Sequence, residues 1–386
     1  MLDGGHAVQS TRTNNAGKIW IILAAAAILA VSLGLIALTY QISQQPETIP
    51  LEWQWNLRWE HNFAAWWSGS LLALASVLAF DNAHTAPGPH LRRAWSVLAL
   101  IILFLALDEI GSLHERMGTL SNAMGAGTWA IAIPLGIIIA ILSIKAGWTM
   151  LMHGGRERVQ IFVLGFGFAV LLSVAVQEYL EHNLDWTGLA ALRAAVEEGS
   201  ELVGISIVIA AVGWPLLKAP AQAFASVIPN ARKMLIGAGI FALPFLAISA
   251  DLNESRGYPS DWIASALFLG AGFIWARQFW TSESRFIPLV LAGLCVLASL
   301  CSVAMGHDES FGIAGFEIAR RGLVYTMLGT ALLVIAGWRA GMALLVPTVL
   351  LILLSSASPL WVFALGTLCG MAAFWSAVQE AHTAPV

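Results

Sequence analysis

Long apolar runs dominate the pattern of this chain. A helix needs about 20 apolar residues to cross a hydrocarbon core of roughly 30 Å. Twelve runs approach this length, over residues 18–40, 63–80, 94–115, 128–150, 159–182, 198–217, 234–250, 262–280, 286–306, 322–338, 343–356 and 358–378. We therefore expect an all-α fold, a polytopic transmembrane helical bundle of about 12 spans.

Short loops join these runs, so the sequence predicts one membrane domain over residues 18–378 between two tails, 1–17 and 379–386. The first run is too long and continuous for a cleaved signal peptide, and we expect it to remain as a helix. The last two runs are joined by the short link Ser355–Pro359. Two separate spans and one re-entrant pair both fit residues 343–378.

A different pattern occupies Leu51–Glu60, where apolar and polar residues alternate at every position. Period two is typical of extended backbone. We expect an interfacial segment near 41–62 on the outer face. It could act as a lid, with Trp53, Trp55 and Trp59 facing lipid or a hydrophobic substrate. The favoured interpretation is an aromatic belt at the level of the headgroups.

Composition supports the membrane assignment, because 58% of the residues are hydrophobic and 11% are charged. Soluble domains contain about 25% charged residues. The net charge of −4 provides no basic field for a phosphate backbone, which excludes nucleic-acid binding as a main activity. Three cysteines without CxxC spacing argue against disulfide frameworks, zinc knuckles and iron–sulfur sites.

The positions of the charges predict an orientation. With the N-terminus inside, 13 of the 19 Lys and Arg residues lie on the cytoplasmic face, as the positive-inside rule requires. An even number of spans returns the C-terminus to the same side. The same topology places 18 of the 23 Asp and Glu residues outside. We expect a plasma (inner) membrane protein with both termini cytoplasmic and an acidic outer face.

Acidic residues also enter the run 94–115, which contains Asp108, Glu109, His114 and Glu115. At a rise of about 1.5 Å per residue, Asp108 would lie about 21 Å above Ala94, within the hydrocarbon core. A charge at that depth costs several kcal/mol unless it faces protein, water or a cation. We take Asp108, Glu109 and Glu115 as candidate catalytic residues and His114 as a candidate metal ligand.

Further acidic clusters occur at the predicted outer ends of other runs. Glu178, Glu181 and His182 share one arc of about 100° on a helix, and Glu197, Glu198 and Glu201 share another. A short link makes the two helices antiparallel neighbours, so these side chains should face each other. The candidate metal ligands are His114, Glu178, Glu181, His182, Glu197, Glu198, Glu201, His307 and Asp308.

Carboxylates and imidazoles gathered at one depth suit a divalent metal such as Mn, Fe, Zn or Ca, whose identity the pattern leaves open. Arg320 and Arg321 could hold an anionic headgroup nearby. A purely structural explanation also exists. Acidic residues at helix N-termini, such as Glu197 and Glu198, stabilise the helix dipole, and outer acids can pair with arginines.

Three functions remain. The first is a metal-dependent membrane enzyme acting on a lipid or other amphiphile, with membrane lipids as its partners. The second is a proton- or cation-coupled transporter, and the third is a scaffold or accessory subunit of a membrane complex. No ionisable residue lies at mid-span, where alternating-access proteins hold their coupling groups, which favours the enzyme. Walker A, dinucleotide, HExxH and nucleophile-elbow motifs do not occur.

Overall fold

The computed structural model describes residues 4–45, 49, 52–58, 62–111, 117, 118, 121, 125, 130–153, 158–183, 189–217, 265, 267–276, 286–304, 310–313, 316–319 and 373. The chain divides into two compact units. The first comprises Met1–Glu60 and Trp67–Ala223, and the second comprises His61–Trp66 and Phe224–Val386.

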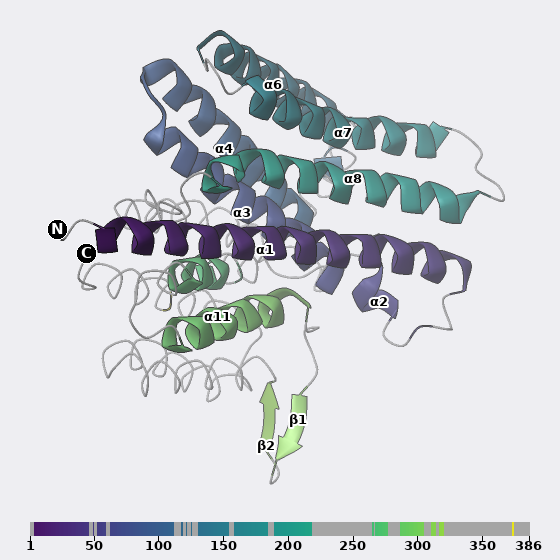
Figure 1. The fold of residues 1–386 in the computed structure, drawn as a ribbon. Coiled ribbons are helices and arrows are strands. Elements are labelled where there is room, and N and C mark those ends of the chain that lie inside the picture. Colours follow the sequence, from purple (N-terminus) through teal and green to yellow (C-terminus); the bar gives the residue numbers. More distant parts are fainter. Residues whose placement is uncertain are drawn as a thin grey trace. The chain divides into compact units, whose positions relative to one another are not determined.

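Helices build the first unit (Figure 1). They are α1 (Gly4–Gln44), α2 (Glu52–Trp55), α3 (Phe63–Thr85), α4 (Pro89–Gly111), α6 (Ala132–His153), α7 (Arg158–Asn183), α8 (Ala190–Val212) and the 3₁₀ helix η3 (Trp214–Leu217). The first turn of α3 belongs to the second unit. Helices α7 and α8 form an antiparallel pair, α1 packs along α8, and α4 packs on α6.

Five of the described helices are long and apolar enough to cross a membrane: Ile21–Gln44, Phe63–Thr85, Pro89–Glu109, Ile133–His153 and Arg158–Gln177. They coincide with the first five predicted runs, so the helical, membrane-type character of the chain is confirmed. Apart from Ala373, the runs at 234–250, 322–338, 343–356 and 358–378 lie outside the described residues.

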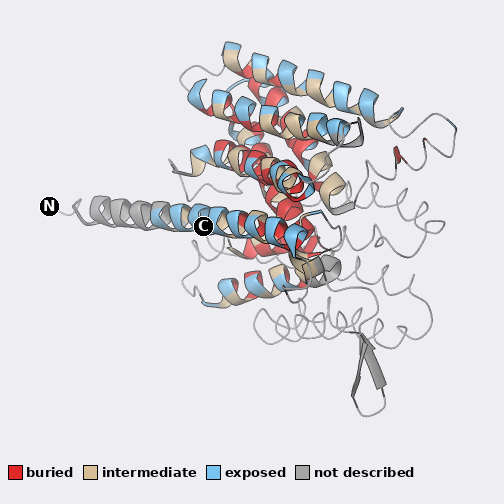
Figure 2. Ribbon diagram, turned by 90° about the vertical axis from the view of Figure 1, so that its right-hand side faces the viewer, coloured by how far each residue is buried: buried red, intermediate tan, exposed pale blue. Residues whose placement is uncertain are grey.

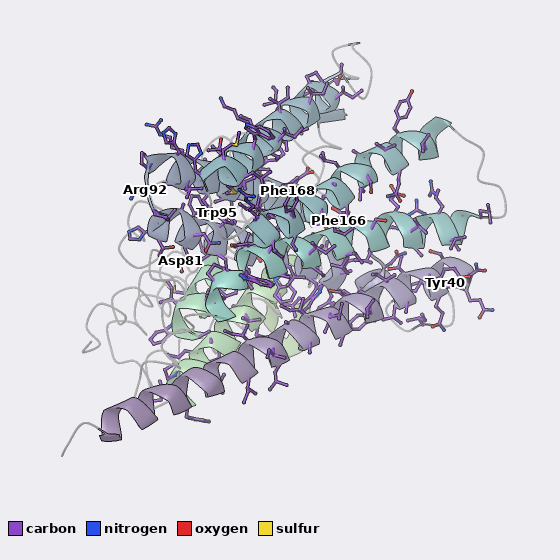
Figure 3. The ribbon with its side chains drawn as sticks, turned by 45° about the horizontal axis from the view of Figure 1, so that its top comes forward. Tyr40, Asp81, Arg92, Trp95, Phe166 and Phe168 are labelled. Atoms are coloured by element: carbon purple, nitrogen blue, oxygen red, sulfur yellow. The ribbon has the colours of Figure 1, made fainter. Side chains whose placement is uncertain are left out.

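Burial distinguishes two faces on these helices (Figure 2). On α7, Phe166 is 62% exposed whereas Phe168 is 8% exposed, and both are labelled in Figure 3. Helices α1 and α6 also expose large aliphatic side chains, among them Leu29 and Ile144. Such faces would be costly in water but are normal against lipid tails, where apolar exposure carries no penalty.

Glycines set the close packing around α8. A Cβ atom on Gly204 would lie 2.9 Å from Cγ of Leu171 on α7, and one on Gly167 would lie 2.9 Å from a methyl group of Val208. On another side, a Cβ on Gly199 would lie 3.3 Å from Ile36 of α1. Membrane helices associate through small residues in this way, because no hydrophobic force drives them together within lipid.

The C-terminal end of α8 is fixed by two side-chain amides. Asn82 of α3 donates from Nδ2 to the carbonyl of Val212 at 2.9 Å, and Gln160 of α7 donates from Nε2 to the carbonyl of Ala211 at 2.9 Å. The last carbonyls of a helix have no partner within the helix. These amides therefore satisfy the end of α8 and tie it to α3 and α7.

The second unit contains α11 (Phe286–Ala304), an apolar helix Leu267–Ala276 and two strands, β1 (Ser310–Ile313) and β2 (Phe316–Ala319). Within it, Nε1 of Trp66 donates to Oγ of Ser299 at 3.0 Å, and Oγ of Ser265 lies 2.8 Å from the same oxygen. Gly272 packs against Cys295, which is buried and free. Hydrogen-bonded serines of this kind help to hold apolar helices together.

Two local expectations differ from the structure. The loop after the run 286–306 forms an antiparallel hairpin in which Phe311 pairs with Ile318, a small departure from an all-helical chain. The alternating segment 51–60 is not extended at 52–55, where α2 forms one helical turn and Asn56 N donates to Glu52 O. A lone strand would leave its backbone groups unpaired, whereas a helical turn pairs some of them within itself.

Candidate functional site

Three helices of the first unit bring the candidate site together. Helices α3 and α4 run antiparallel, and Oγ of Ser76 donates to the carbonyl of Ala99 at 2.8 Å. This pairing places Ser68, near the start of α3, beside Glu109, near the end of α4. Helix α8 contributes Glu201.

Glu109 joins the three helices. Its Oε1 accepts a hydrogen bond from the hydroxyl of Ser68, which is 1% exposed. Its carboxyl group also shares a hydrogen bond with that of Glu201. Both glutamates are partly buried. A hydrogen bond between two carboxyl groups requires a proton on one of them, so the pair can carry two negative charges only if a cation neutralises them.

Two more acidic side chains surround this pair. Asp108 and Glu198 both interact electrostatically with Glu201. We call Asp108, Glu109, Glu198 and Glu201 the carboxyl cluster. Like charges gathered at one place repel, and the site must relieve this by protonation or by binding a cation.

The start of α4 changes the expected depth of these groups. The helix begins at Pro89 rather than near 94, and its apolar stretch of 21 residues ends at Glu109. Twenty-one residues extend about 31 Å, roughly the thickness of the hydrocarbon core. Asp108 and Glu109 therefore lie at the end of this apolar stretch, whereas counting from Ala94 had predicted a position for Asp108 within the core.

The residue at which α8 begins excludes the helix-dipole explanation for Glu197 and Glu198. The helix begins at Ala190, so Glu197 and Glu198 lie in its interior and its first turn contains no acidic residue. Interior acids gain little from the helix dipole, whose effect is confined to the first and last turns. The N-terminal explanation is therefore wrong for these two residues. The sequence 190–196 contains mainly Ala and Leu, strong helix formers that extend the helix beyond the apolar run.

Two arginines lie beside the carboxyl cluster. Arg193, in the first turn of α8, interacts with Arg58, Glu197 and Glu198. Burial and then the charge of Arg58 lower the pKa of Arg193, and the two glutamates offset this only in part. In the sequence, Arg58 and Arg193 showed no pattern beyond a position on the predicted outer face, and the candidates for substrate binding were Arg320 and Arg321.

The predicted site residues fall into two groups. The structure brings Asp108, Glu109, Glu198 and Glu201 together, and it buries Glu197 on the same helix as Arg193. The side chains of Glu178, Glu181 and His182, at the end of α7, are outside the described set, as are His114, Glu115, His307, Asp308, Arg320 and Arg321. Among the described residues, no group of three or more His, Cys, Asp or Glu side chains is arranged to hold a metal ion.

Comparison with known proteins gives one match. Residues 20–214 match a family model described as a domain of unknown function, DUF8692. No curated protein and no solved structure matches the chain. The matched region contains the whole carboxyl cluster and both neighbouring arginines.

Proposed function

This chain belongs to the DUF8692 family, and we propose that it is a metal-dependent membrane enzyme that acts on a lipid or other amphiphilic substrate. The observation that carries the proposal is the contact between Glu109 and Glu201. Two acidic side chains from different helices, α4 and α8, meet there, with two further carboxyl groups nearby. A divalent cation would neutralise the pair and turn their repulsion into binding.

The chemistry of the donors fits such an ion. Glu109 and Glu201 would provide two carboxylate ligands, and His114 and Glu178 are the candidates to complete the set. A bound divalent ion would polarise a substrate oxygen or lower the pKa of a water molecule. The hydroxyl of Ser68 holds Glu109 in position, and Asp108, which interacts with Glu201, is the proposed general acid or base.

The proposal includes an orientation, with the carboxyl cluster on the extracytoplasmic side of the plasma (inner) membrane and both termini in the cytoplasm. The distribution of basic residues supports it. Arg92 lies in the first turn of α4, at the predicted cytoplasmic end of the helix, nineteen residues before Gly111. Figure 3 shows Asp81 and Arg92 toward one end of the helices and Tyr40 toward the other.

Reporter fusions test this orientation. A reporter enzyme that is active only outside the cytoplasm should be active when fused after Gly125 and inactive when fused after Gly154. The two fusion points should lie on opposite sides of the membrane, because an odd number of predicted spans separates them. Reporter activity per amount of fusion protein is the measurement, with immunoblots as the control for expression. The reverse pattern would place the carboxyl cluster inside and would contradict the orientation.

Metal analysis tests the proposed function directly. The purified, detergent-solubilised protein should contain one or two divalent ions per chain, and chelation should lower its melting temperature, because an ion that binds the folded state stabilises it by mass action. Elemental analysis and thermal unfolding measure the two effects. A metal site would be refuted if the purified protein contained no metal and its melting temperature changed neither with chelator nor with added Mn²⁺, Zn²⁺, Fe²⁺ or Ca²⁺.

Ser68 should affect metal affinity indirectly, because its hydroxyl orients the proposed ligand Glu109. Ser68→Ala should weaken metal binding by about 10- to 100-fold, the usual effect of removing a partner that orients a ligand. Ser68→Thr should restore much of the affinity, because it keeps the hydroxyl. Ser70→Ala is a matched control, since its buried hydroxyl on the same helix has no hydrogen-bond partner. Equal affinity in wild type and Ser68→Ala would exclude this role.

A proton- or cation-coupled transporter is the second candidate. The specific observation in its favour is the hydrogen bond between Glu109 and Glu201, since a proton shared by two carboxyl groups is also a site for proton uptake and release. Liposomes containing the protein would then show proton-coupled flux that Glu201→Gln abolishes. Flux from metal-free protein would favour the transporter over the enzyme, and neither metal nor flux would favour a scaffold.

A further inference from the structure

Two histidines meet at the end of α4 that lies away from the carboxyl cluster. His90 belongs to the first turn of α4, and His153 is the last residue of α6. Their imidazole rings stack, with centroids 4.9 Å apart and planes inclined by 19°. Glu109 lies nineteen residues further along α4, about 28 Å away along the helix axis. The histidine pair is therefore separate from the candidate site.

The fold determines where the two rings lie. Gly88 has a left-handed backbone conformation, with φ 87°, that turns the chain after α3, and Pro89 begins α4. The N–H of Arg92 donates to the carbonyl of Gly88 at 3.2 Å and closes the first turn. Helix α4 packs on α6 (Figure 1). The contact between the rings therefore follows from the packing of these two helices.

A hydrogen bond fixes the position of the proton on the ring of His153. Its Nδ1 lies 2.9 Å from the carbonyl oxygen of Thr149, one turn earlier on α6. A carbonyl oxygen only accepts hydrogen bonds, so Nδ1 carries the proton, and Nε2 of the neutral ring keeps its lone pair. Metal-binding histidines are usually held in this way, with one ring nitrogen donating to a carbonyl and the other bound to the ion.

The spacing of the rings fits two ligands of one ion. With bonds of about 2.0 Å from the metal to each nitrogen, two imidazoles at about 90° to 110° around one ion have centroids about 5 Å apart. The observed separation is 4.9 Å. Both histidines are exposed, so water can complete the coordination. Arg92 and Arg93 follow on α4, but both are exposed, and water weakens their repulsion of a cation.

We propose that His90 and His153 bind one divalent transition-metal ion that links α4 to α6. Imidazole nitrogens suit Ni²⁺, Cu²⁺ and Zn²⁺, whereas Ca²⁺ and Mg²⁺ prefer oxygen ligands. The site goes beyond the proposed function, because it uses neither the carboxyl cluster nor any ion bound there. An ion held by both helices stabilises the folded state by mass action.

Nickel titration of the full-length protein in detergent, without a polyhistidine tag, tests this site. Ni²⁺ should bind the pair at about one ion per chain and raise the melting temperature. His90→Gln and His153→Gln should each weaken this binding by about tenfold or more, because each removes one of two ligands. His84→Gln changes another exposed histidine, in the last turn of α3, and as the matched control should stay within about twofold of wild type.

His153→Phe separates metal binding from ring packing. Phenylalanine can still stack on His90 but has no nitrogen donor. The metal-free variant should therefore melt at about the wild-type temperature, and Ni²⁺ should no longer raise that temperature. Wild-type Ni²⁺ affinity in His153→Phe or in His90→Gln would overturn the proposal.

Glu201→Gln distinguishes this site from the carboxyl cluster. The variant removes a proposed ligand of the cluster and leaves both histidines in place, so the pair should bind Ni²⁺ within about twofold of wild type. Nickel binding that Glu201→Gln abolishes and the two histidine variants retain would assign the ion to the carboxyl cluster and contradict the proposal. A carboxyl cluster without metal would refute the proposed function and leave the nickel result intact.

Discussion

Glu201→Gln and Glu109→Gln should each reduce the bound metal from near-stoichiometric amounts to less than about a tenth, and with it any metal-dependent turnover. The amide keeps the shape of the side chain but loses the negative charge that binds a cation. Each variant removes one of the two carboxyl groups that meet between α4 and α8. Elemental analysis of the purified variants measures the effect.

The stability of these variants provides an internal check. An amide next to a carboxylate can hydrogen-bond without an extra proton, so each variant should melt at or above the temperature of chelated wild type. Glu52→Gln, on α2, is the matched control and should keep its metal. Variants that retain the full metal content would show that the ion, if present, binds elsewhere. Variants that fail to fold would show a structural role for the pair instead.

Gly204→Leu should destabilise the first unit by about 3 kcal/mol or more, at the upper end of the range for overpacking. A Cβ at this position would lie 2.9 Å from Cγ of Leu171 and 3.2 Å from its backbone nitrogen. The backbone of α7 cannot rotate away as a flexible side chain can. The two helices would have to separate, and membrane helices depend on close contact.

Gly165 on α7 provides the matched control, because nothing lies within 4 Å of a Cβ placed there. Gly165→Leu should be neutral or stabilising by up to about 1 kcal/mol, since leucine favours helix more than glycine does. Thermal unfolding in detergent distinguishes the two variants. Equal melting temperatures would show that α7 and α8 do not depend on the contact at Gly204.

Hydropathy predicted where the helices lie but not where they begin. The apolar runs matched the first five membrane-type helices because lipid requires about 20 apolar residues per span. Helix ends depend instead on hydrogen bonds and on local propensity. Thus α8 starts at Ala190, before its apolar run, and α4 starts at Pro89. These earlier starts changed the positions assigned to Glu197 and Asp108.

The candidate site was predictable only in part. Helical periodicity identified Glu109 and Glu201 as unusual acids on different helices, and the structure brings them together. The roles of Ser68 and Arg58 were not predictable, because each depends on contacts between residues far apart in the chain. Ser68 lies 41 residues from Glu109, and Arg58 is positioned through a hydrogen bond to α1. A single serine or arginine forms no repeating pattern in the sequence from which its role could be predicted.

The amides that fix the C-terminal end of α8 determine where Glu201 lies, because a tilt of the helix about that end would displace Glu201. Asn82 and Gln160 fix its last carbonyls, and Glu201 lies eleven residues nearer the start. At about 1.5 Å per residue this arm is about 16 Å long, so a tilt of about 5° at the fixed end moves Glu201 by about 1.4 Å. Displacements of about 1 Å can cost a catalytic site about 100-fold in rate. Substitutions at Asn82 would thus misalign carboxylates that they never touch.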